Sequence, residues 1–127
     1  MDAFKNIKLY LCLFILMALE GKLDIAQIEW DERPALSVVM ASDGYPGSYI
    51  KGFPISGIND AEKIGAFIFH AGTKKDEKGN TITDGGRVLG ITALGNYLKE
   101  AREIAYTAVK KISWKGCFHR TDIGLEE

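Results

Sequence analysis

Glycine and proline interrupt this chain so often between residues 33 and 95 that no long helix fits there. The segments Asp43-Gly44-Tyr45-Pro46-Gly47 and Gly52-Phe53-Pro54 each predict a turn. Between such turns lie short apolar runs, Leu36 to Ala41 and Ala66 to Ala71, which are typical of strands buried on at least one face. This part of the chain is therefore expected to form a sheet of short strands.

The next stretch predicts a β-hairpin and one more strand. The polar run Asp76-Glu77-Lys78-Gly79-Asn80 lies between a strand expected to end near Lys74 and another expected to begin near Thr81. Asp84-Gly85-Gly86 predicts a second turn, and Arg87 to Ala93 a further strand. Within that strand, Gly90 is expected to mark a bulge or the close approach of a neighbouring backbone.

The apolar period changes after residue 95 and predicts one amphipathic helix from Asn96 to Ile112. Its apolar side chains recur at three- and four-residue steps: Leu98, Ala101, Ile104, Ala105, Ala108, Val109 and Ile112. Asn96 is the expected N-cap, and Lys110 and Lys111 suit the negative end of the helix dipole. The tail from Trp114 to Ile123 is expected to return as a last strand. The predicted fold class is α+β, a small antiparallel β-barrel or sandwich with a covering C-terminal helix.

Charge and cysteine content exclude several classes of function. With 16 basic and 17 acidic side chains the net charge is −1, so no overall field attracts nucleic acid or an anionic membrane. Any anion must be bound locally. Cys12 and Cys117 match no metal or redox spacing, which predicts reduced, packed thiols in a cytoplasmic protein.

The apolar run from Leu9 to Leu19 follows Lys5 and Lys8 and is open to two interpretations. It has the outline of a secretory signal, a basic start followed by an apolar stretch of about 7 to 15 residues. It is too short to span a membrane, which takes about 20 apolar residues. The small-residue cleavage pattern around Ala18 is poor. We therefore favour an apolar N-terminal helix in residues 1–24 over a signal peptide, followed by a β-rich domain in residues 25–127.

Six segments, taken together, resemble one protein family in their order and amino-acid sequence. They are Glu-Gly-Lys-Leu-Asp at 20–24, Arg-Pro-Ala-Leu-Ser-Val-Val-Met-Ala-Ser at 33–42, Gly-Tyr-Pro-Gly at 44–47, Phe-His-Ala-Gly-Thr-Lys at 69–74, Gly-Gly-Arg-Val-Leu-Gly-Ile-Thr-Ala-Leu-Gly at 85–95 and Asp-Ile-Gly at 122–124. The chain is similar in these segments to the C-terminal domain of the phosphoribosylamine–glycine ligase family, the ATP-grasp ligases of purine synthesis. The resemblance implies a barrel-sandwich hybrid fold.

The resemblance also implies a function and its partners. The whole enzyme would join glycine to 5-phosphoribosylamine, giving glycinamide ribonucleotide, ADP and phosphate. ATP and Mg²⁺ would be held by the ATP-grasp and N-terminal parts of the ligase, supplied by the same gene or by a split chain. The apolar helix in residues 1–24 would be a remnant of the connection to that ATP-grasp domain and would pack against it. This domain would hold phosphoribosylamine or glycinamide ribonucleotide, and alone it is not expected to turn over. No nucleic acid or membrane partner is expected.

The candidate site residues are Lys74, Gly85, Gly86 and Arg87. Two cations at neighbouring strand ends, beside a glycine pair whose N–H groups can converge on an anion, would form a local phosphate site. Alone, each cation is more often a solvated surface charge, and the glycine pair is as readily a tight turn. By the resemblance, Lys74 and Arg87 fall in the family's Ala-Gly-Thr-Lys and Gly-Gly-Arg motifs. In related ATP-grasp enzymes of purine synthesis a Lys and an Arg of the C-terminal domain approach the ribose 5-phosphate, and by analogy Lys74 and Arg87 would do so here.

Other polar residues are not expected to bind ligands, and two other classes of protein stay open. His70 is expected to be a packed, hydrogen-bonded strand residue, and His119 is not expected to be essential. Asp43, Asp84 and Asp122 are expected to cap their own turns, and no metal ligand is assigned. A biotinyl or lipoyl carrier domain stays open because Lys78 lies at a hairpin tip, and a secreted binding module stays open because of the apolar N-terminus.

Overall fold

The computed structural model describes residues 3–27 and 30–125, with side chains from residue 11 onward. Contacts divide the chain into two units, Met1–Glu32 and Arg33–Glu127. The first unit holds helix α1 (Ala3–Leu19) and a short 3-10 helix, η1 (Leu23–Ile25). No helix in the described part of the chain is long and apolar enough to cross a membrane.

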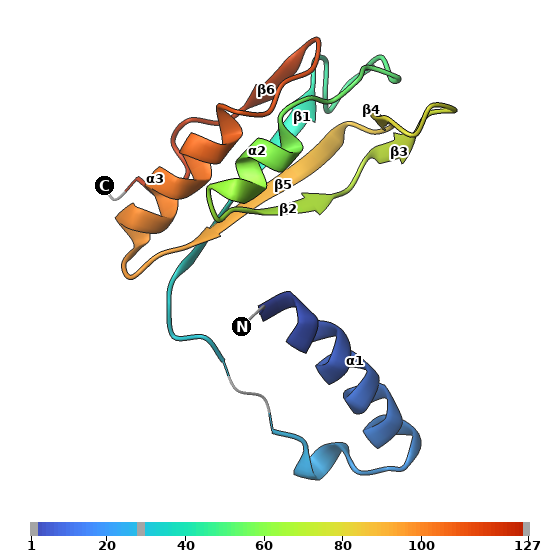
Figure 1. Ribbon diagram of the computed structural model, residues 1–127, viewed down its shortest axis with the longest axis vertical. Helices are drawn as coiled ribbons and strands as arrows, with labels where there is room; N and C mark the ends of the chain where they lie inside the picture. The colour runs from blue at the N-terminus through green and yellow to red at the C-terminus, as the bar shows by residue number, and fades with distance from the viewer. Residues whose placement is uncertain (1–2, 28–29, 126–127) are drawn as a thin grey trace. The chain divides into compact units, whose positions relative to one another are not determined.

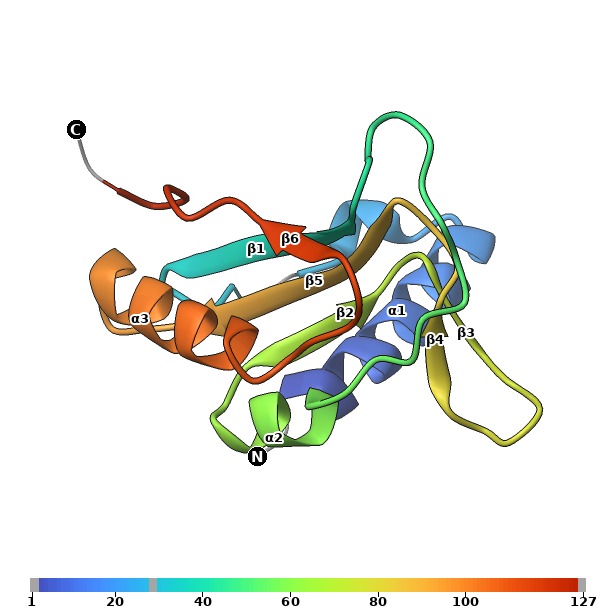
Figure 2. The same ribbon diagram turned by 90° about the horizontal axis from the view of Figure 1, so that it is seen from above.

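The second unit is built on a four-stranded antiparallel sheet with the strand order β2-β5-β1-β6. Its strands are β1 (Ala35–Ser42), β2 (Phe67–His70), β5 (Arg87–Leu94) and β6 (Cys117–His119), which confirms the strands expected from sequence. The hairpin β3 (Thr73–Lys75) and β4 (Thr81–Thr83) forms a separate two-stranded sheet that connects the end of β2 to the start of β5 (Figures 1 and 2).

The sheets are open. Strands β2 and β6 are the edges of the larger sheet, so within the residues described here no closed barrel forms. The α+β class with antiparallel strands is confirmed, whereas the barrel-sandwich detail is not.

One face of the larger sheet is covered by α2 (Ile58–Lys63) and α3 (Leu98–Val109), which lie side by side in Figure 1. Alternation along β1 directs every second side chain toward this face. Helix α3 faces the sheet with the small side chains of Ala101, Ala105 and Ala108, so its backbone can approach the sheet closely. The core is formed by these alanines with Leu36, Val38, Met40, Leu89, Ile91, Ala93 and Val109, all buried.

Three local expectations are wrong. The helix after residue 95 begins at Leu98 with Tyr97 at the N-cap position, because Asn96 donates to the Glu100 carboxylate through its backbone N–H and its side chain, at 2.6 and 2.9 Å. The irregularity in β5 lies at Val88, which is the extra residue where Met40 pairs with Leu89 and Ala41 with Arg87. At Gly90 an added Cβ would meet nothing nearer than 3.7 Å, so no close backbone approach requires glycine there.

Candidate functional site

Three loops meet beside the start of β5: the β2–β3 turn at Gly72, the turn at 84–86 and the loop at 43–52. Gly72 donates its N–H to the Arg87 carbonyl at 2.9 Å, and the Asp84 N–H donates to the Gly72 carbonyl at 2.7 Å. Ser42, at the end of β1, donates its N–H to the Gly86 carbonyl and its hydroxyl to the Gly85 carbonyl, at 2.8 and 2.9 Å. Ser42 therefore holds the two glycines through their carbonyls, while Gly72 holds the flanking residues Asp84 and Arg87.

The glycines are required by close packing. A Cβ on Gly72 would lie 2.5 Å from the Cα of Gly85, and a Cβ on Gly85 would lie 2.8 Å from the Cα of Gly72. At Gly86 a Cβ would lie 2.2 Å from the ring of Tyr45 and 3.0 Å from that of Tyr49. The backbone here comes close enough to its neighbours that only glycine fits.

The N–H groups of Gly85 and Gly86 donate no hydrogen bond to any described residue, although both carbonyls accept one. Gly86 is buried and Gly85 is half-buried. An N–H group without a partner in such a place is uncommon, because it loses water without gaining a replacement. Two such donors next to each other are what a bound anion would satisfy.

Cationic side chains lie close to this turn. The ammonium of Lys74 lies 3.4 Å from Asp84 Oδ1, and the ammonium of Lys51 lies 3.7 Å from the same oxygen. Arg87 is exposed, and its guanidinium makes no hydrogen bond or ion pair with the described residues. The structure thus brings Lys74, Gly85, Gly86 and Arg87 to one region. Whether they bind phosphate stays a prediction.

The sequence analysis missed Lys51 and assigned the wrong role to Asp84. The expectation that Asp84 caps its own turn is wrong, because its carboxylate faces the two lysines. Asp76 plays the capping role instead, accepting from the N–H groups of Lys78 and Asn80 at 2.9 and 2.8 Å. In sequence, Lys51 differs from any loop lysine only in following Tyr45 and Tyr49, and that pattern alone does not locate it beside Asp84.

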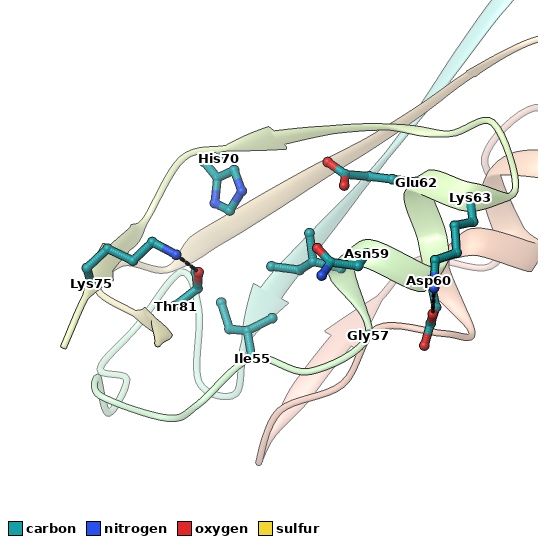
Figure 3. Close-up of a pocket in the computed structure, with 10 residues that line it drawn as sticks. Ile55, Gly57, Asn59, Asp60, Glu62, Lys63, His70, Lys75 and Thr81 are labelled. Atoms are coloured by element: carbon teal, nitrogen blue, oxygen red, sulfur yellow. Dashed lines mark hydrogen bonds and ion pairs between the residues drawn. The ribbon is translucent and has the colours of Figure 1, made fainter. Parts of the chain in front are cut away.

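A cavity of about 560 Å³ opens on another side of the hairpin, between it and α2 (Figure 3). Its polar lining includes Asn59, Glu62, His70, Lys75 and Thr81. Lys75 follows Lys74 in β3, and neighbouring strand residues point to opposite faces, so the cavity and the glycine turn lie on different faces of the hairpin. The Lys75 ammonium donates to the Thr81 hydroxyl at 2.8 Å.

The remaining polar candidates have ordinary structural roles. His70 is exposed rather than packed, although it is hydrogen-bonded as expected, with Nδ1 3.0 Å from the Thr73 hydroxyl. A hydrogen bond from Lys63 lowers the pKa of Asp60 at the cavity rim. Both cysteines are free, but Cys12 is exposed and so is not the packed thiol expected. The described residues hold no cluster of three histidine, cysteine or acidic side chains arranged for a metal ion.

Comparison with known proteins identifies the family. The family model described as phosphoribosylglycinamide synthetase, C domain, matches residues 35–126, which include the whole glycine turn and its cations. The chain belongs to this family. A chloroplastic phosphoribosylamine–glycine ligase of Arabidopsis thaliana is 51% identical to it over 112 residues, and the Escherichia coli (strain K12) phosphoribosylamine–glycine ligase is 50% identical over 109. The family match favours neither a biotinyl or lipoyl carrier nor a secreted binding module.

The fold agrees with the sequence similarity. A crystal structure of phosphoribosylamine–glycine ligase from Thermotoga maritima superposes with a TM-score of 0.68 at 30% identity, over 85% of this chain and 27% of that one. The matched regions are 87% of this chain but 21% of the Arabidopsis protein, and 86% of this chain but 25% of the Escherichia coli protein. The chain therefore spans about a quarter or less of the length of these curated relatives.

Proposed function

We propose that this chain supplies the C domain of a phosphoribosylamine–glycine ligase and binds the phosphate of phosphoribosylamine or glycinamide ribonucleotide. The observation that carries the proposal is the pair of N–H groups at Gly85 and Gly86, which find no partner among the described residues, with Lys74 and Arg87 nearby. Backbone donors and fixed cations around one point are a recurrent way to bind a phosphate monoester.

In the whole enzyme ATP would phosphorylate the glycine carboxylate, and the amine of phosphoribosylamine would attack the resulting acyl phosphate. Holding the sugar phosphate fixes where that amine lies, and correct orientation of reactants accounts for much of such catalysis. The described residues offer no cluster of side chains suited to Mg²⁺, so they do not fit the metal. We assign ATP and Mg²⁺ to the part of the ligase that this chain does not match, which is also its proposed partner.

The compartment stays a prediction. The free thiols favour the cytoplasm, whereas one relative carries a chloroplastic name.

The proposal is tested in a ligase that contains this domain in its full-length context. Lys74→Ala or Arg87→Ala removes a charge-assisted hydrogen bond of about 1.5–3 kcal/mol, and about 1.4 kcal/mol corresponds to a tenfold change in affinity. KM for phosphoribosylamine should therefore rise tenfold or more in steady-state kinetics, with KM for ATP and for glycine almost unchanged.

Lys75→Ala is the matched control, since it removes a neighbouring lysine that points to the other face of the same hairpin. It should leave all three KM values unchanged. An unchanged KM for phosphoribosylamine in both Lys74→Ala and Arg87→Ala would reject the site. Equal losses for all three substrates would indicate a misfolded hairpin instead of a lost phosphate contact.

A further inference from the structure

The loop at residues 43–52 closes over the glycine turn. Its two tyrosines meet Gly86 from one side, and their ring centroids are 6.5 Å apart with planes inclined by 54°. The rings leave no space for a side chain at Gly86. This loop therefore forms one wall of the region into which the unpartnered N–H groups of Gly85 and Gly86 could donate.

The end of the same loop is fixed to β4. Gly52 donates its N–H to the Thr83 carbonyl at 2.7 Å, and Phe53 exchanges hydrogen bonds with the backbone and the hydroxyl of Thr83, at 2.9 and 3.1 Å. Thr83 is completely buried, so this attachment point is rigid. Because Lys51 precedes Gly52 and Asp84 follows Thr83, the pairing places the Lys51 side chain beside Asp84.

Asp84 holds two lysines loosely. Its Oδ1 lies 3.7 Å from the Lys51 ammonium and 3.4 Å from the Lys74 ammonium, both longer than an ordinary hydrogen bond. The side chains are 52% and 54% exposed, and Asp84 is 37% exposed. Ion pairs of this kind contribute little to stability, so both ammonium groups can turn to a more highly charged anion at little cost.

We propose that Lys51 is a third phosphate-positioning residue of this site, and that Asp84 keeps Lys51 and Lys74 together before the phosphate arrives. The inference rests on the proposed function and extends it. Three cations and one carboxylate give the cluster a charge of about +2, which matches the charge of −1.5 to −2 on a phosphate monoester at neutral pH. Without Lys51 the cluster would carry only about +1.

Binding of ribose 5-phosphate to the 127-residue chain tests this directly. In ¹H–¹⁵N correlation spectra the wild-type Gly85 and Gly86 amides should shift on titration with ribose 5-phosphate and not with ribose. Lys51→Ala should raise the dissociation constant for ribose 5-phosphate about tenfold, as expected for the loss of one charge-assisted hydrogen bond. Lys51→Arg should recover most of the affinity, and Lys75→Ala should bind as the wild type does.

The outcomes separate the two proposals. If the wild-type amides do not respond to ribose 5-phosphate, the phosphate site itself is rejected, and the role of Lys51 with it. If the wild type binds and Lys51→Ala binds equally well, only the role of Lys51 is overturned. Resonances far from the turn report in the same spectra whether each variant keeps its fold. If Lys51→Ala lowers the affinity for ribose 5-phosphate and Lys51→Arg lowers it equally, the role of Lys51 as a positioning cation is also contradicted.

Discussion

At the residue scale, Gly72 and Gly85 join the hairpin to the start of β5 through direct backbone contact. In Gly72→Ala the new methyl would lie 2.5 Å from the Gly85 Cα and 2.7 Å from the Arg87 carbonyl oxygen, and backbone atoms cannot move aside cheaply. We expect a loss of about 1–3 kcal/mol in the free energy of unfolding, the usual cost of overpacking. Urea denaturation measures it.

Gly90→Ala provides the matched control for this prediction. It adds the same methyl within the same sheet, but its nearest neighbour would lie 3.7 Å away, which is ordinary contact. Its free energy of unfolding should change by less than about 0.5 kcal/mol or increase slightly. Equal effects of the two substitutions would show that the Gly72–Gly85 contact relaxes without cost.

Asp122 gives the domain a specific dependence on acid. The hydrogen bonds and charge of Arg120 lower the pKa of the Asp122 carboxyl to about 2, from an ordinary value of 3.8. Because the folded pKa is the lower one, the stabilisation is complete above about pH 4 and is lost as the pH falls toward 2. The stability difference between wild type and Asp122→Asn should therefore be largest near pH 5 and shrink by pH 2.

Urea midpoints measured at several pH values between 2 and 5 would show this trend. Arg120→Ala removes the cause of the lowered pKa and should reduce the same pH dependence. A difference between wild type and Asp122→Asn that stays constant over this range would contradict the role of the pair.

At the scale of elements, the sequence predicted those strands and helices whose apolar patterns are long and regular. The apolar run of β1, bounded by turn residues, and the three- and four-residue steps of α3 each extend over several residues, so single exceptions do not obscure them. Helix α2 was missed because it has only the six residues Ile58–Lys63, too few to establish a period. The start of α3 was misplaced by two residues because Asn96 lies before the helix and donates its N–H and side chain to the Glu100 carboxylate in the first turn.

The candidate site was predictable only where its residues share a motif. Gly85, Gly86 and Arg87 are consecutive, and Lys74 belongs to a second motif at the hairpin. Lys51 reaches the site through the pairing of Gly52 with Thr83, 31 residues apart in sequence, and no local pattern encodes that register. The same pairing decides that Asp84 meets lysines instead of capping its turn.

At the scale of the whole molecule, helix α1 of the first unit exposes a row of large apolar side chains. Leu11, Ile15 and Leu16 are more than half exposed, and Leu19 is 80% exposed. Apolar surface of this extent in water favours association. We expect the 127-residue chain to form dimers or larger species in light scattering, and a variant that begins at Lys22 to be monomeric.

Two results would contradict this prediction. A full-length chain that stays monomeric at high concentration would show that the apolar surface of α1 does not associate. A shortened chain that associates as strongly as the full-length chain would locate the association outside α1, in the residues from Lys22 onward.

The place of β1 in the sheet has a consequence for how the chain is made. This strand leaves the ribosome before the other strands of the sheet, yet both of its partners, β5 and β6, follow much later in the sequence, and β6 is the last of the described strands. Until then the apolar face of β1 has no helix to cover it, because α3 is also translated late. The sheet can thus close only after residue 119 has been synthesised. A nascent chain that stalls before residue 117 would leave one edge of β1 unpaired, and such an edge invites aggregation or degradation.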